Sequence, residues 1–149
     1  MFLLQVLLAI NLGLNFLLGL NVFDNPVDVL GATVLELALS AALLYAGLRT
    51  HGKGERWRQS YTALLGIGAI GALLALSYRT VASLIGIPEL AGLLDLAVFF
   101  WLLVAMAHIV RHSFEIALPF AIIIVFLYTM FMLGLVAQWF VPELPAAQP

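Results

Sequence analysis

Two histidines stand four residues apart in a chain that has few other ionisable groups. His108 and His112 would share one face of a helix, and Glu115 follows closely, which is a spacing that metal ligands can use. The chain has one other histidine, His51. This is too few histidines for a di-iron site, and it does not provide the second axial ligand that a bis-histidine haem needs. Cysteine is absent, which excludes thiolate ligands. We therefore predict no metal and no cofactor, and expect both histidines to meet lipid headgroups or neighbouring loops.

A carboxylate near the middle of an apolar run is the second candidate site. Glu36 lies within residues 27–48, and an ionised group at the centre of a membrane helix costs about 2.5 to 3.5 kcal/mol on insertion scales. Folding the chain at the preceding turn brings Asn11 and Asn15 to the same level, with Ser40 close to the face of Glu36. We expect a buried polar cluster. Two interpretations are open. In the first, the cluster is a functional site that relays protons or cations or contacts a lipid headgroup. In the second, a protonated Glu36 forms hydrogen bonds with the asparagines and holds the helices together.

Arg79 and Asp95 form a third constellation. Folding the chain about Gly86 places them at similar depth, so we expect a structural ion pair. Arg79 could otherwise extend to the interface or meet an anionic substrate. We expect no catalytic site, because the possible nucleophiles, Ser83 and Ser113, do not come together with the histidines as bases. The sequence therefore predicts a protein that is not an enzyme.

The elements that carry these residues follow from composition. Of 149 residues, 64% are hydrophobic and 9% are charged, against about 45–50% apolar and 25% charged in soluble domains. This excludes a soluble enzyme, a disordered chain and a nucleic-acid binder. A spanning helix needs about 20 apolar residues. Five such runs predict an all-α, polytopic integral membrane protein with one domain, residues 1–149. Its helices are expected at about 1–23, 27–48, 59–84, 89–110 and 114–140.

Basic residues predict the orientation of the helices. Arg49, Lys53, Arg56 and Arg58 lie between the second and third runs, and Arg111 lies between the fourth and fifth. Because lysine and arginine favour cytoplasmic loops, we predict a cytoplasmic N-terminus and an outside C-terminus. The first run lacks a positive segment and a cleavage site, so we expect it to be retained rather than removed as a signal peptide. The basic face suits anionic lipid, and an acidic partner is an open alternative.

Small residues predict how two of the helices pack. Ala38, Ala42 and Ala46 recur every four residues in the second run, and Gly66, Gly68 and Gly71 lie in the third. Such stripes let helix backbones approach closely, so we expect these two helices to form a tight pair. The glycines also spell the dinucleotide-binding pattern G-x-G-x-x-G. That motif requires a strand before it and a helix after it, and here it lies inside an apolar span.

One family resemblance rests on the polar segment and the helix after it. The motif HGKG at residues 51–54, then Gln59 and Thr62-Ala63-Leu64 opening a glycine-bearing helix, resembles the Yip1-like families of small five-span membrane proteins. The resemblance covers about the last two thirds of the chain and implies the five-span architecture. This chain departs from the eukaryotic members because it begins directly in an apolar run and lacks the proline expected in the third helix. Their role in vesicle trafficking is therefore not carried over.

The leading functional prediction is a non-enzymatic accessory, scaffold or assembly subunit of a bacterial inner membrane. It would act through helix contacts with lipids and other membrane chains, as a homo-oligomer or in a larger complex, and would bind no nucleic acid. The alternative is a channel or transporter for a proton, cation or small solute that uses Glu36, Asn11 and Asn15.

Overall fold

The fold is an all-helical bundle. The computed structural model describes residues 1–20, 23 and 25–140, and every regular element within them is helical, as predicted. Each of the five α-helices is long and apolar enough to cross a membrane. The expected end of the first helix near residue 23 falls partly outside the described residues, and so does the segment 141–149. The elements are α1 (Phe2–Gly19), α2 (Pro26–Thr50), the short 3₁₀ helix η1 (Gly54–Arg56), α3 (Trp57–Ile85), α4 (Pro88–Phe114) and α5 (Leu118–Phe140).

Local sequence explains where α2 begins and where α3 ends. Asn25 caps α2 by accepting a hydrogen bond from the Val27 amide at 3.0 Å, and Pro26 occupies the first helical position, where its missing amide proton is not needed. At the end of α3, Gly86 adopts a left-handed conformation with φ of 72°, and the Ile87 amide bonds back to the Ala82 carbonyl at 3.1 Å. This is the geometry that glycine provides after a helix.

The link between α4 and α5 was predicted in the wrong place. The sequence prediction ends the fourth helix near residue 110, whereas α4 continues through Phe114, so Arg111 lies in its last turn. No glycine or proline interrupts this stretch, and a basic side chain there complements the carboxyl end of the helix dipole. Glu115 then stops the helix in a left-handed conformation with φ of 59°.

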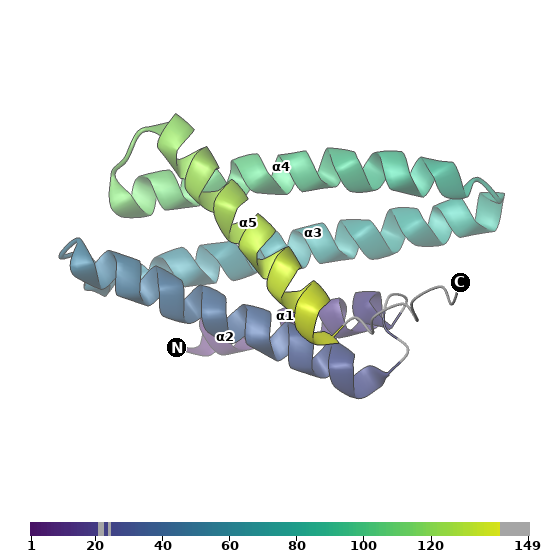
Figure 1. Ribbon diagram of the computed structural model, residues 1–149, viewed down its shortest axis with the longest axis horizontal. Coiled ribbons are helices and arrows are strands. Elements are labelled where there is room, and N and C mark those ends of the chain that lie inside the picture. The colour runs from purple at the N-terminus through teal and green to yellow at the C-terminus, as the bar shows by residue number, and fades with distance from the viewer. Residues whose placement is uncertain (21–22, 24, 141–149) are drawn as a thin grey trace, which may run out of the picture.

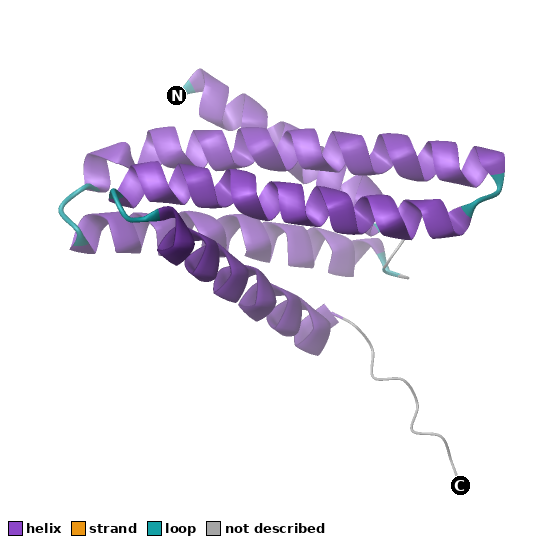
Figure 2. Ribbon diagram, turned by 90° about the horizontal axis from the view of Figure 1, so that it is seen from above, coloured by secondary structure: helices purple, strands orange, loops and turns teal. Residues whose placement is uncertain are grey.

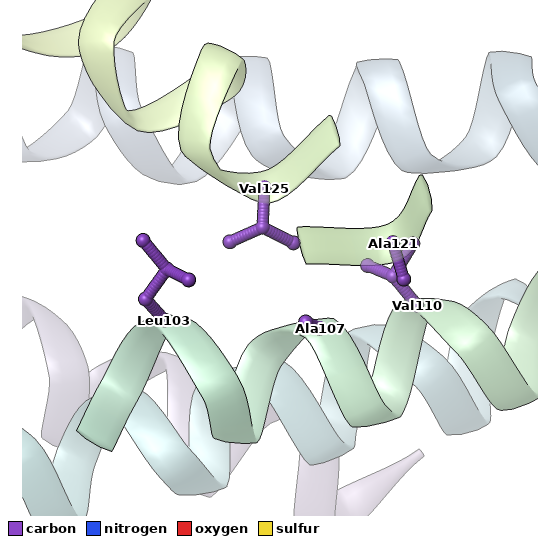
Figure 3. Packing of buried hydrophobic residues seen from close by; sticks show 5 residues of the cluster. All are labelled: Leu103, Ala107, Val110, Ala121 and Val125. Carbon is purple, nitrogen blue, oxygen red and sulfur yellow. The ribbon is translucent and has the colours of Figure 1, made fainter. Parts of the chain in front are cut away.

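Helices α2, α3 and α4 form a central layer, with α1 on one side of it and α5 on the other (Figure 1 and Figure 2). In Figure 1, α3 and α4 run side by side as an antiparallel hairpin, α2 lies below them, and α5 crosses in front at an oblique angle. The turned view places α1 on the opposite side of the layer from α5 (Figure 2). The α4–α5 contact is a compact apolar cluster in which Ala107 and Ala121 are fully buried between Leu103, Val110 and Val125 (Figure 3). Two alanines at the crossing let the two backbones approach closely.

The expected tight pairing of α2 with α3 is wrong. Ala38, Ala42 and Ala46 are all exposed, so the alanine stripe of α2 points out of the bundle.

The glycines of α3 meet other helices instead. A Cβ atom at Gly68 would lie 2.8 Å from Asn11 Oδ1 of α1, and one at Gly71 would lie 2.8 Å from the side chain of Leu102 on α4, while one at Gly66 would have no such neighbour within 4 Å. Because α1 carries a polar side chain that fits against Gly68, it occupies the face of α3 that α2 was expected to cover.

Candidate functional site

A cavity of about 510 Å³ lies inside the bundle, and all five α-helices contribute to its wall. Most of the lining side chains are apolar, chiefly leucines of α2 and α3 with residues of α4 and α5. No lysine, arginine or histidine of the described chain lines it. The polar and acidic lining residues are Asn11, Asn15, Glu36, Ser40, Tyr61, Tyr78, Asp95 and Tyr128.

Glu36 projects from the middle of α2 onto the cavity wall. Many protein atoms lie around it, yet the residue is exposed, and it is one of the residues that line the cavity. Among the described residues, neither a hydrogen bond nor an ion pair to its carboxylate is present. Taking an ionised carboxylate out of water without a partner is costly. Glu36 must therefore carry a proton or meet a cation that none of the described residues supplies.

The two asparagines line the same cavity but do not hold Glu36. Asn11 is buried, and its side-chain amide donates to the backbone carbonyl of Leu65 on α3 at 2.6 Å and to that of Leu7 at 3.0 Å. Asn15 donates to the Asn11 carbonyl at 2.9 Å. Asn11 thus joins α1 to α3. The interpretation in which the asparagines bond to a protonated Glu36 has no counterpart among these contacts.

Three residues with hydroxyl groups, Ser40, Tyr61 and Tyr128, line the cavity together with Glu36. Ser40 donates to the Leu37 carbonyl at 3.0 Å, and the Tyr61 hydroxyl donates to the same carbonyl at 2.7 Å. The Tyr128 hydroxyl, from the middle of α5, is buried and has no hydrogen-bond partner among the described residues. Glu36 is an electrostatic neighbour of both tyrosines. Glu36 and Tyr128 thus line the same cavity, the first with an unpaired carboxylate and the second with a buried hydroxyl that has no described partner.

The second carboxylate of the cavity is already compensated. The Arg79 guanidinium donates to Asp95 Oδ1 through Nη2 at 2.9 Å and Nε at 3.1 Å, and the Tyr78 hydroxyl donates to the same oxygen. The structure thus brings together the two residues expected to pair. Arg79 itself does not line the cavity, and its charge is directed at Asp95.

Charges at the other end of α3 are arranged around Glu115. This carboxylate accepts from Lys53 Nζ at 2.7 Å and Arg56 Nη1 at 2.6 Å, and Lys53 also donates to the Phe114 carbonyl at 3.0 Å. Hydrogen bonds from Lys53 and then Arg56 lower the pKa of Glu115 below its ordinary value. We call this end, which carries Arg49, Lys53, Arg56, Arg58 and Arg111, the basic end.

The other basic residues have different surroundings. Arg49 and Arg58 border a shallow cleft between Tyr45 and Trp57, whose rings meet edge to face, and Arg111 is exposed. His108 and His112 are both exposed. Within the described part of the chain, no group of three or more histidine, aspartate or glutamate side chains could hold a metal ion.

The cavity includes tyrosines that the sequence analysis did not single out. Tyr61 and Tyr128 belong to helices whose apolar residues give no marked face, so nothing in their spacing points to a common site. A usable signal is that both are polar-tipped aromatic residues inside long apolar runs, where a buried hydroxyl normally needs a partner.

Comparisons with family models, with curated proteins and with solved structures found no match for this chain. The resemblance to Yip1-like families thus stays an expectation from the sequence.

Proposed function

We propose that this protein is a non-enzymatic, multi-pass membrane carrier that binds a small amphiphilic solute in the cavity between its helices. The observation that carries the proposal is an unpaired Glu36 facing a cavity of about 510 Å³ with a mostly apolar wall. Ligand sites are typically cavities of about 300–1,000 Å³ with apolar walls and a few convergent polar groups. An ionisable residue inside a membrane segment is a functional candidate by default.

The wall favours binding over catalysis. Its serine, Ser40, donates its proton to a backbone carbonyl, and no histidine or lysine of the described chain is present in the lining to act as a base. A nucleophile, a base and an orienting group within reach of one another are the minimum for acyl or phosphoryl transfer. Reversible binding of a solute is what these groups support.

In this proposal the basic end faces the cytoplasm of a bacterial inner membrane, because the positive-inside bias favours that arrangement. The chain contains no cysteine, so single-cysteine variants can be labelled without background. Thr50→Cys and Ile87→Cys lie at opposite ends of the bundle, and both positions are exposed. An impermeant maleimide applied to intact cells should label Cys at 87 and spare Cys at 50. The reverse pattern would invert the proposed orientation.

Binding can be tested by filling the cavity. The neutral dye N-phenyl-1-naphthylamine, titrated into nanodiscs that contain the protein, should show saturable fluorescence above that of empty nanodiscs. Ser40→Phe places a large ring in the cavity wall and should abolish the saturable part. Val34→Phe is the matched control, because Val34 is an exposed residue of the same helix that does not line the cavity. Equal saturable binding in both variants would contradict the proposal.

Transport is tested by dye release from proteoliposomes. The native protein should accelerate release over protein-free vesicles, and Ser40→Phe should return the rate to the protein-free value. If the dye binds but is released no faster than from protein-free vesicles, the protein binds the solute without transporting it.

A second candidate, an accessory or assembly subunit, is favoured by the outward-facing stripe Ala38, Ala42 and Ala46. Small residues every four positions on a lipid-facing surface allow another helix to approach closely. If this candidate is correct, the native chain forms discrete oligomers or complexes in mild detergent and Ala42→Phe dissociates them. A monomeric native chain across several detergents would exclude it.

A further inference from the structure

We propose that the solute held in this cavity is a lipophilic organic cation, with its positive centre against Glu36 and its apolar part along the leucine-rich wall. This inference rests on the proposed carrier function and names the class of its ligand. It follows from the charges of the cavity, from what surrounds Glu36, and from the chemistry of the wall.

The charge of the cavity is one-sided. Two carboxylates, Glu36 and Asp95, line it, and no described basic residue does. Arg79 neutralises Asp95 from beside the cavity, with the Tyr78 hydroxyl as a second donor. Glu36 has no such partner among the described residues, so a ligand that enters the cavity while Glu36 is ionised meets one negative centre with no compensating charge. An anionic ligand would be repelled there, whereas a cation would replace the missing partner.

Two tyrosines line the cavity together with the unpaired carboxylate. Tyr61 comes from α3 and Tyr128 from α5, and both are electrostatic neighbours of Glu36. The face of an aromatic ring attracts an organic cation, and the combination of rings and a carboxylate is suited to alkylammonium or arylphosphonium groups.

The wall argues against an inorganic ion. Magnesium and calcium require several oxygen ligands, usually with more than one carboxylate, or keep many of their waters. Here the second carboxylate is already paired with Arg79, which leaves Glu36 as the single unpaired carboxylate of the described lining. Most of the remaining surface is leucine, valine and phenylalanine. Such a wall binds an organic ion that carries its own apolar surface, whereas it would leave a hydrated metal ion without ligands.

The test uses two ions of nearly equal shape and opposite charge, tetraphenylphosphonium and tetraphenylborate. Each is added to nanodiscs in which the protein has bound N-phenyl-1-naphthylamine, and displacement is corrected for partitioning into empty nanodiscs. We expect the cation to displace the dye at concentrations at least tenfold lower than the anion, which is about 1.4 kcal/mol. The chain carries a net charge of −2, so the contribution of the surface is separated from that of the cavity by variants.

Three variants assign the preference to Glu36. Glu36→Gln should bring the cation-to-anion ratio to about one while dye binding persists, which also shows that the variant folds. Glu36→Asp keeps the charge and should retain the preference. Glu89→Gln removes a carboxylate that does not line the cavity and should leave the ratio at the native value.

The outcomes separate the two proposals. Equal or tighter binding of tetraphenylborate, or a preference that survives Glu36→Gln, would overturn the cationic class while leaving a solute-binding cavity in place. Dye binding that does not saturate, or that Ser40→Phe leaves unchanged, would instead overturn the carrier function itself, together with this inference.

Discussion

Replacing Gly68 with alanine tests whether Asn11 locks α1 onto α3. The new Cβ atom would lie 2.8 Å from Asn11 Oδ1, well inside ordinary van der Waals contact. Asn11 cannot turn aside freely, because its amide nitrogen is bound to the Leu65 carbonyl at 2.6 Å and the Leu7 carbonyl at 3.0 Å. To make room, the side chain must give up its bond to α3.

Gly68→Ala has two opposing effects of similar magnitude: the hydrogen bond from Asn11 to α3 is lost, and the helix preference of α3 increases. Interhelical hydrogen bonds in membrane proteins contribute about 0.6 kcal/mol on average and at most about 1.7 kcal/mol. Alanine is favoured over glycine inside a helix by about 1 kcal/mol. In the native chain, Gly68→Ala should therefore change the free energy of unfolding little. In an Asn11→Ala background there is no bond left to break, and the same substitution should stabilise the bundle by about 1 kcal/mol.

The assay is a double-mutant cycle measured by denaturation in mixed micelles. The helix preference of alanine is the same in both backgrounds and cancels, so the cycle isolates the contact between positions 11 and 68. We expect a coupling energy of about 1 kcal/mol, within the range of such interhelical bonds.

Gly66 provides the matched control for the cycle. It lies on the same helix, and a Cβ atom there would have no such neighbour within 4 Å, so Gly66→Ala should have the same effect with and without Asn11. A coupling for Gly68 within about 0.3 kcal/mol of zero, the scatter of independent sites, would refute the lock.

Three further predictions concern other contacts. Glu115→Gln should lower the midpoint of thermal unfolding in detergent at pH 7. Hydrogen bonds from Lys53 and Arg56 lower the pKa of Glu115, so its contribution is present in full above the free glutamate value of about 4.3 and is lost as the pH falls through the lowered value. A difference between the two proteins that does not shrink as the pH falls below about 4.3 would contradict this. Tyr128→Phe should leave the midpoint of the ligand-free protein unchanged or raise it, because the buried hydroxyl has no described partner, and a clear decrease would reveal a missed bond. Gly31→Ala should lower the midpoint because its Cβ atom would lie 2.8 Å from Phe140 Cε1, and Phe140→Ala should remove most of that loss.

The sequence was sufficient to predict the helices and which of their residues lie at similar levels along the bundle. Charges and turn formers bound each apolar run, and the hydrocarbon thickness sets how long a run must be, so five helices follow from chain chemistry alone. The same depth argument placed Arg79 opposite Asp95 and brought Asn11, Asn15 and Glu36 to one level. All of these residues except Arg79 line the cavity.

The rotation of each helix about its axis could not be predicted. Ala42 is exposed and Gly68 packs on α1, although both were expected at one interface. In an apolar chain nearly every face is hydrophobic, so periodicity does not distinguish a buried face from one that meets lipid. A polar side chain such as Asn11 does fix the rotation of its helix, because its hydrogen bond must be satisfied. Its partner, however, is the backbone carbonyl of Leu65, and a backbone carbonyl cannot be identified as a partner from the residue type.

The oblique path of α5 explains why the carboxylate of Glu36 remains unpaired. Near the basic end, α5 packs on α4 through Ala121 and Ala107, and at its other end Phe140 lies against Gly31 of α2. Between these contacts the helix crosses from α4 to α2 and covers the space between them without filling it (Figure 1). Tyr128 and Glu36 lie near the middles of α5 and α2, so both border that space. In that position Glu36 either carries a proton or, as we propose, meets a cation that enters the cavity.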